Sequence, residues 1–127
     1  METILVVDDE PLVLNLCNVA LTRAGYGVIM ASDGKTALEL CREGNLHVDL
    51  ALVDAAMPDM TGADLADCLR ALGVRVVVMS GYSRDQVEER IGRSINYDKY
   101  LAKPFSQTTL KIAVQEALQA PKTRTAK

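Results

Sequence analysis

The chain of 127 residues is 49% hydrophobic and 24% charged, with a formal net charge of −3. This length and composition predict one folded domain and exclude a disordered chain. No apolar run approaches the ~20 residues that cross a bilayer, and the acidic balance argues against direct nucleic-acid binding, which needs clustered Lys and Arg. The three cysteines lack metal-ligand spacing, so we expect free thiols in a cytoplasmic protein without membrane insertion.

Apolar runs and helix signals alternate along the chain. The runs are continuous, which is typical of strands covered on both faces of a parallel sheet. Pro11 suits a first helical turn, Gly25 suits a helix C-cap, and Ser83 with Gln86 forms a capping box. The expected elements, in chain order, are a strand over 4–7, a helix over 11–24, a strand over 28–31, a helix over 34–42, a strand over 50–53, a helix over 62–72, a strand over 74–79, a helix from Ser83 through 91, a weaker strand over 100–102, and a helix capped by Ser106 that ends before Pro121.

Five strand–helix units with short connections predict an α/β fold, an open doubly wound sandwich. Right-handed crossovers bring ligands to the carboxyl ends of the strands, next to the point where the strand order reverses. The functional residues are therefore expected at that edge of the sheet.

Polar residues follow four of the five predicted strands. Asp8 and Asp9 come after the first, Asp54 after the third, Ser80 after the fourth and Lys103 after the fifth. Each has an ordinary explanation, because Asp and Ser often cap helices or form turns and a lone Lys is usually a solvated charge. Their joint occurrence favours a shared crevice.

Clustered carboxylates need a compensating cation. Two carboxylates ~4 Å apart repel by about 4 kcal/mol at an effective dielectric of 20. Lys103 supplies one positive charge, and a divalent ion such as Mg²⁺, which prefers oxygen ligands, would supply the rest. Carboxylate, hydroxyl, lysine and Mg²⁺ together are suited to handling a phosphoryl group.

The sequence resembles the receiver domain of two-component response regulators. The similar motifs are Asp8-Asp9, the segment from Asp54 to Pro58 followed by Gly62, Ser80-Gly81, and Lys103-Pro104-Phe105. The resemblance covers about residues 4–118, which gives an expected receiver domain over 1–120 and a C-terminal tail over 121–127. It implies a (βα)5 flavodoxin-like fold with a five-stranded parallel sheet in the order 2-1-3-4-5.

The resemblance also implies roles for the site residues. Asp54 is the expected phosphoacceptor, and Lys103 pairs with it before transfer and with the phosphoryl group afterwards. Asp9, Asp54 and the backbone carbonyl of Ala56 are expected to bind Mg²⁺ directly, with Asp8 acting through water. These roles describe a signalling domain that assists its own phosphorylation and dephosphorylation rather than an enzyme.

Ser80 and Tyr100 are the expected switch. Ser80 would donate its hydroxyl to the phosphoryl group, after which Tyr100 turns inward; alternatively, Tyr100 is simply a β-favouring aromatic residue. A cis peptide bond is expected before Pro104. Ser80 stands where the family more commonly has threonine. Ala56 and Tyr82 also depart from the family, and together they predict slow loss of the phosphoryl group.

The implied partners are a histidine kinase or a histidine-phosphotransfer protein and a downstream protein target. Beside its expected core stripe (Val13, Leu16, Cys17, Ala20 and Ala24), the first helix carries further apolar residues, which form either a broader buried face or a docking patch. The output face would comprise the fourth helix, fifth strand and fifth helix. The docking-patch residues are Leu12, Leu14, Val19 and Leu21, and the expected exposed output contacts are Arg84, Arg90, Arg93, Lys99 and Lys111.

Two other classes of function fit the sequence less well. A Mg²⁺-dependent aspartyl-phosphate hydrolase would need substrate loops or a cap domain. A flavodoxin-like cofactor binder would need a phosphate loop where Asp8, Asp9 and Glu10 would repel phosphate. The sequence leaves open whether the chain acts alone or is a receiver excised from a hybrid kinase.

Overall fold

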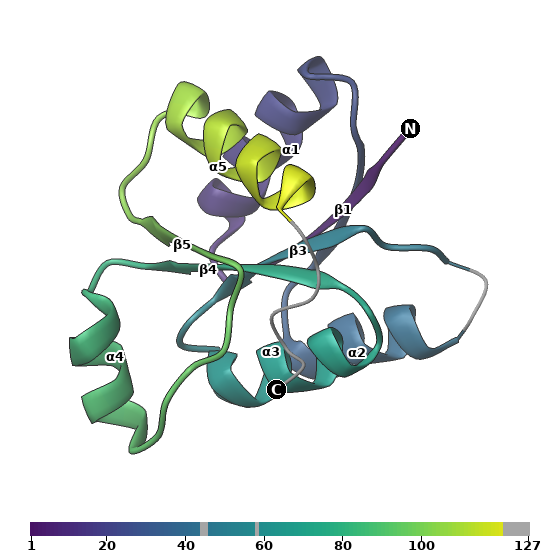
Figure 1. Cartoon of the computed structure of the whole chain (residues 1–127). Helices are drawn as coiled ribbons and strands as arrows, with labels where there is room; N and C mark the ends of the chain where they lie inside the picture. Colours follow the sequence, from purple (N-terminus) through teal and green to yellow (C-terminus); the bar gives the residue numbers. More distant parts are fainter. Residues whose placement is uncertain (44–45, 58, 121–127) are drawn as a thin grey trace.

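One parallel sheet of five strands, in the order β2-β1-β3-β4-β5, organises the chain (Figure 1). This computed structural model describes residues 1–43, 46–57 and 59–120, so the expectations for Pro58, Pro121 and the tail over 121–127 lie outside the described residues. The strands are β1 (Thr3–Val7), β2 (Gly27–Ala31), β3 (Leu50–Asp54), β4 (Arg75–Ser80) and β5 (Lys99–Ala102). The helices are α1 (Pro11–Arg23), α2 (Gly34–Arg42), α3 (Gly62–Ala71), α4 (Arg84–Ile91) and α5 (Gln107–Gln119). The predicted fold class and strand order are confirmed.

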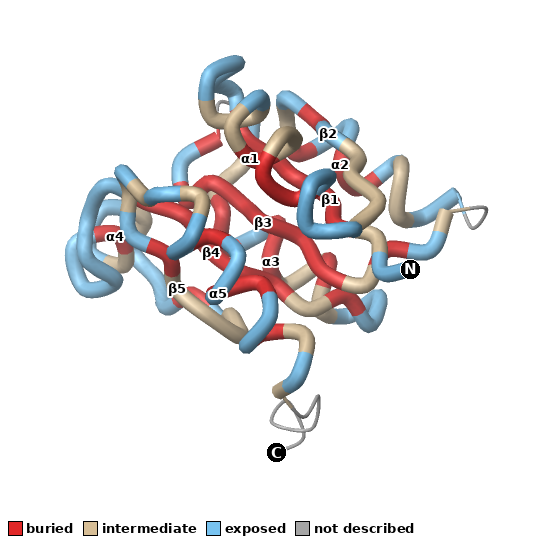
Figure 2. The backbone as a smooth tube through the Cα atoms, turned by 90° about the horizontal axis from the view of Figure 1, so that it is seen from above, coloured by how far each residue is buried: buried red, intermediate tan, exposed pale blue. Residues whose placement is uncertain are grey.

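Helices cover both faces of the sheet, α1 and α5 on one side and α2, α3 and α4 on the other (Figure 1). Successive side chains of a strand point to opposite faces. Ile4 and Val6 accordingly pack with α1 and α5, whereas Leu5 and Val7 pack with α2 and α3. The central strands are buried along almost their whole length (Figure 2). Burial on both faces explains why the strands are continuous apolar runs.

The predicted core stripe of α1 is partly wrong. Ala24, expected on the buried stripe, is exposed because it is the C-cap residue, and Gly25 follows it at φ +97°. Leu21, expected beside the stripe, is fully buried between the sheet and α5. The angle at which α5 packs against α1 decides which side chains are covered, and a helical period alone does not contain that angle.

Strand register brings the expected site residues to one edge. β1 pairs with β3 through Val7 and Val53, so the residues that follow, Asp8 and Asp54, are neighbours. Across the sheet, Asp54 pairs with Met79 and Ser80 pairs with Ala102, immediately before Lys103. Among the described residues, no helix is both long and apolar enough to cross a membrane.

A nearly buried ion pair fastens the segment before β5 to α3. Oδ2 of Asp98 accepts hydrogen bonds from Nη1 of Arg70 at 2.7 Å and from the backbone N–H of Val76 at 2.8 Å. The two side chains are only 12% and 7% exposed, for Arg70 and Asp98 respectively. Removing the carboxylate would leave a buried guanidinium and a buried N–H without this partner.

We therefore expect Asp98→Ala to lower the free energy of unfolding by about 3 kcal/mol, since an unpaired buried charge is costly. Urea unfolding measures the effect. Asp85→Ala is the control, because Asp85 forms an exposed pair with Arg84 and should cost far less. Equal losses in the two variants would contradict this interpretation.

Candidate functional site

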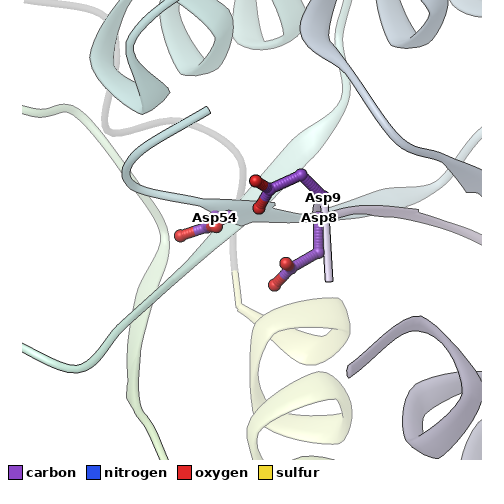
Figure 3. A group of neighbouring side chains, drawn as sticks. All are labelled: Asp8, Asp9 and Asp54. Carbon is purple, nitrogen blue, oxygen red and sulfur yellow. The ribbon is translucent and has the colours of Figure 1, made fainter. Parts of the chain in front are cut away.

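Three carboxylates meet at the carboxyl edge of the sheet (Figure 3). Asp8 and Asp9 follow β1, and Asp54 ends β3. One oxygen from each lies within 4.8 Å of the others. Asp8 and Asp54 are buried, and Asp9 is exposed to solvent. The structure thus brings together the acidic residues that the sequence singled out.

Lys103 is the cation that faces this cluster. Its Nζ lies 2.7 Å from Oδ2 of Asp8 and 3.7 Å from Oδ2 of Asp54, with Oε1 of Glu10 at 3.4 Å. The expected pairing with Asp54 is present, but the shorter contact is with Asp8. Sequence reasoning missed Glu10 as a partner, although its place directly after Asp9 is a signal for one. The Lys103–Pro104 peptide bond is cis, as expected.

The environment of Asp54 disfavours its charge. Burial is the largest cause, and it raises the pKa of Asp54 from 3.8 to about 6. The charge of Lys103 and the backbone N–H of Ala56, which donates to Oδ1 at 3.3 Å, oppose the rise, while the charges of Asp8 and Asp9 add to it. Burial by itself lowers the pKa of Lys103, but its hydrogen bond to Asp8 and the nearby carboxylates outweigh burial and raise that pKa.

The residues present fit a divalent cation. Three carboxylates converge, and Lys103 is the cation paired with them among the residues that the structure describes. The cluster therefore keeps excess negative charge, and that charge contributes to the raised pKa of Asp54. Oxygen donors of this kind are the ligands that Mg²⁺ prefers.

Ser80 and Tyr100 are joined through Tyr82. The Ser80 hydroxyl oxygen is buried and accepts a hydrogen bond from the Tyr82 backbone N–H at 3.0 Å. The Tyr100 hydroxyl donates to the Tyr82 carbonyl at 2.8 Å. The Arg90 guanidinium stacks on the Tyr82 ring, 4.2 Å from its centre. The sequence did not reveal this junction, because it depends on how α4 folds back on its own loop.

Two expected surfaces differ in detail from the prediction. On α1, Leu12 is 85% exposed while Leu21 is buried, so the extra apolar residues are divided between the surface and the core. On the expected output face, Arg93 is paired with Asp64 and Asp67 of α3, and Lys99 is paired with Glu116 of α5. These pairs engage two of the five basic side chains that sequence reasoning left as exposed contacts.

Metal-free protein should become less stable as Asp54 ionises. A pKa that is higher in the folded state than in the unfolded chain contributes stability below pH 4 that is lost as pH rises through about 6. A pKa rise of this size changes the free energy of unfolding by at most about 3 kcal/mol. In EDTA, Asp54→Asn should therefore gain stability relative to wild type between pH 4 and 7.

Urea unfolding over this pH range measures the difference between the two proteins. A difference between wild type and Asp54→Asn that stays constant with pH would contradict the raised pKa.

Known proteins match both the sequence and the fold. The family model of the response regulator receiver domain matches residues 4–115. The DNA-binding response regulator MtrA of Mycolicibacterium smegmatis is 34% identical over 118 residues, covering 93% of this chain and 51% of that protein. CpxR, a transcriptional regulatory protein of Escherichia coli, is 32% identical over 119 residues, which cover 94% of this chain and 50% of that protein. The chain thus spans about half the length of the curated relatives it matches.

Solved structures agree with these relatives. CheY4, a chemotaxis response regulator of Vibrio cholerae, superposes with a TM-score of 0.77 at 27% identity, covering 92% of this chain and 98% of that one. The response regulator TrrA of Thermotoga maritima, solved in complex with Mg(2+)-BeF, gives a TM-score of 0.74 at 29% identity, covering 92% and 99%. Since the family model spans most of the chain and the fold superposes on these structures, the chain belongs to the receiver domains of the two-component response regulators.

Proposed function

We infer that the chain accepts a phosphoryl group on Asp54 from the phosphohistidine of a histidine kinase or histidine-phosphotransfer protein. The observation that carries this proposal is the surroundings of Asp54. Its carboxylate ends β3, is nearly buried, and lies 3.7 Å from the Lys103 amine and beside two further carboxylates. A nucleophile, a fixed cation and a cation-binding cluster are what a phosphoryl acceptor needs.

The reaction requires little beyond positioning. An Asp54 oxygen forms a bond to phosphorus as the phosphorus–nitrogen bond breaks, and the electron pair of that bond stays on the imidazole. The pKa of Asp54 is about 6, so the carboxyl group is mostly ionised at neutral pH and needs no general base. Lys103, held by Asp8, stabilises the negative charge on the phosphoryl oxygens.

Mg²⁺ is the proposed cofactor. Asp8, Asp9, Asp54 and the backbone carbonyl of Ala56 would hold it, and when bound it supplies positive charge to the phosphoryl oxygens. The convergence of the three carboxylates supports this assignment. The Mg(2+)-BeF complex of the similar Thermotoga maritima protein supports it as well.

The proposed switch runs from Ser80 through Tyr82 to Tyr100. A hydroxyl both donates and accepts, so Ser80 could donate to a phosphoryl oxygen while its oxygen accepts the Tyr82 N–H. Its side chain also hydrogen-bonds with Tyr100, a contact that such a donation would replace. A movement of Ser80 would shift the Tyr82 backbone, whose carbonyl accepts from Tyr100. This geometry favours the role of Tyr100 as a switch over a purely β-favouring aromatic.

The proposed partners follow from the surfaces. The exposed Leu12, at the start of α1 and close in sequence to Asp9, supports docking of the phosphodonor there. The face of α4, β5 and α5 is the proposed output surface for a downstream protein, with no direct nucleic-acid contact by these residues. The chain acts as a signalling domain rather than an enzyme, and its three unpaired cysteines suit the proposed cytoplasmic location.

Treatment with acetyl phosphate and Mg²⁺ should add one phosphoryl group to the wild type and none to Asp54→Asn, which lacks the nucleophile. Asp9→Ala should lose most of the adduct because a metal ligand is gone. Intact-mass measurement follows both, with Asp85→Asn as a control that labels normally. An adduct on Asp54→Asn would refute the phosphoacceptor, and continuous turnover of acetyl phosphate in place of a stoichiometric adduct would indicate a hydrolase.

The Ser80→Ala variant should still accept the phosphoryl group on Asp54, but phosphorylation should no longer change the conformation at Tyr100 and α4. Phosphorylation-induced NMR shifts at Tyr100 and along α4 are expected in wild type and in Ser80→Thr, which keeps the hydroxyl, and are expected to disappear in Ser80→Ala. Shifts of equal size in all three proteins would contradict the proposed coupling.

The phosphoryl group should be lost slowly. Ala56 offers no polar side chain to orient an attacking water. The Arg90 guanidinium holds the Tyr82 ring, and we expect this ring to obstruct the approach of water. Ala56→Asn combined with Tyr82→Glu should shorten the lifetime of the adduct about tenfold, which corresponds to ~1.4 kcal/mol of barrier. Loss of the adduct over time measures this, with Tyr82→Phe as a near-neutral control; an unchanged or longer lifetime in the double variant would overturn the expectation.

A further inference from the structure

The segment between Asp54 and α3 is closed at its base by backbone contacts. Ala56 and Thr61 form an antiparallel bridge, and the Gly62 N–H donates to the Ala55 carbonyl at 2.9 Å. The approach is close enough that a Cβ on Gly62 would lie 2.7 Å from Cα of Ala55. These contacts hold the two ends of the loop together, and the part farther from the sheet makes separate contacts with α2.

Asp59 fastens that outer part to α2. Its Oδ1 accepts from the backbone N–H of Gly34 and its Oδ2 from that of Lys35, both at 2.9 Å. N–H groups in the first turn of a helix have no partner within the helix. These two backbone hydrogen bonds are the main reason that the pKa of Asp59 is lowered, which agrees with a carboxylate bound in its ionised form.

Apolar packing supports the same attachment. A Cβ on Gly34 would lie 2.5 Å from Cγ and Sδ of Met60, so the Met60 side chain rests directly on the first turn of α2. α2 is itself anchored in the core by Ala37 and Leu38. The loop is thus held against a fixed element by two hydrogen bonds and by one packed side chain.

α2 has a cap of its own and does not depend on Asp59 for one. Asp33, the N-cap residue, accepts from the Thr36 N–H at 2.7 Å. The contacts of Asp59 cross 24 and 25 residues of sequence and join two separate elements. Removing Asp33 takes away a contact within α2 alone, whereas removing Asp59 takes away the hydrogen bonds that join the loop to α2, so the two carboxylates form a matched pair for an experiment.

The loop carries Ala56, whose N–H donates to the Asp54 carboxylate. We propose that Asp59 is a positioning residue, which holds the loop on the N-terminus of α2 so that the Ala56 backbone stays beside Asp54 for metal binding and phosphoryl transfer. This inference rests on the proposed function for its metal and its phosphoryl group. The contact of Asp59 with α2 and that of Ala56 with Asp54 are features of the structure itself.

The test compares Asp59→Ala with Asp33→Ala and Asp59→Asn. The readouts are the Ala56 amide resonance without metal, the Mg²⁺ affinity from amide NMR shifts, and urea unfolding. Asp59→Ala should shift the Ala56 amide and weaken Mg²⁺ binding about tenfold, the low end for a group that supports metal ligands. Asp59→Asn keeps one acceptor and should fall between Asp59→Ala and wild type. Asp33→Ala should lose stability but keep the wild-type Ala56 amide and affinity.

An unchanged Ala56 amide and Mg²⁺ affinity in Asp59→Ala would overturn the positioning role. Equal changes in Asp33→Ala would overturn it too, because they would show that only the stability of α2 matters. Absence of Mg²⁺ binding in wild type would instead refute the proposed cofactor, while the metal-free Ala56 amide would still decide the role of Asp59.

Discussion

The structure depends on one electrostatic constraint, the burial of two carboxylates against a single amine. Asp8 and Asp54 end neighbouring strands, and Lys103 reaches both from the segment after β5. The contact between Lys103 and Asp8 joins residues 95 positions apart in the chain, so it links the first strand to the last. Burial is the main reason that the pKa of Asp54 stays raised, and the charges of Asp8 and Asp9 add to it. One amine does not balance three carboxylates, so the edge of the sheet is suited to a further cation.

The same constraint relates the fold to the proposed switch. The acidic cluster lies at the carboxyl ends of β1 and β3, while Ser80 ends β4 and pairs with Ala102 of β5, immediately before Lys103. In the proposed switch, a change of charge at Asp54 would act one strand away, where Tyr82 contacts Ser80, Tyr100 and Arg90. Coupling of this kind needs an element with two arrangements, and the loop between β4 and α4 is the proposed one.

The opposite end of α4 is held more firmly. Arg93 pairs with Asp64 and Asp67 of α3, and Asp98 with Arg70. Val87 is the buried residue of α4, so the helix rests on the domain through few apolar contacts. Few buried contacts together with one tethered end favour movement at the other end, the end that carries Ser83 and adjoins Tyr82.

The limits of prediction differ from residue to residue. The capping box and the strand runs were predictable because they are local: the side chains of Ser83 and Gln86 each bond the backbone N–H of the other residue, within four residues of sequence. Ala24 was wrongly assigned to the core stripe of α1, and the burial of Leu21 was left open, because the packing of the distant α5 decides which side of α1 is covered. Asp59 was missed because its partners, Gly34 and Lys35, belong to another element.

The sequence by itself determined the alternation of five strands and five helices and the family, because buried parallel strands and capped helices leave local patterns. It also determined that acidic, hydroxyl and lysine side chains share one edge, since parallel strands end together. Only the tertiary structure decided that Lys103 lies closer to Asp8 than to Asp54, that Tyr82 is the junction between Ser80 and Tyr100, and that Asp59 holds the Ala56 loop on α2. Those contacts join segments that are far apart in the sequence. The packing of the helices against the sheet sets the distances between them, and local sequence patterns do not contain those distances.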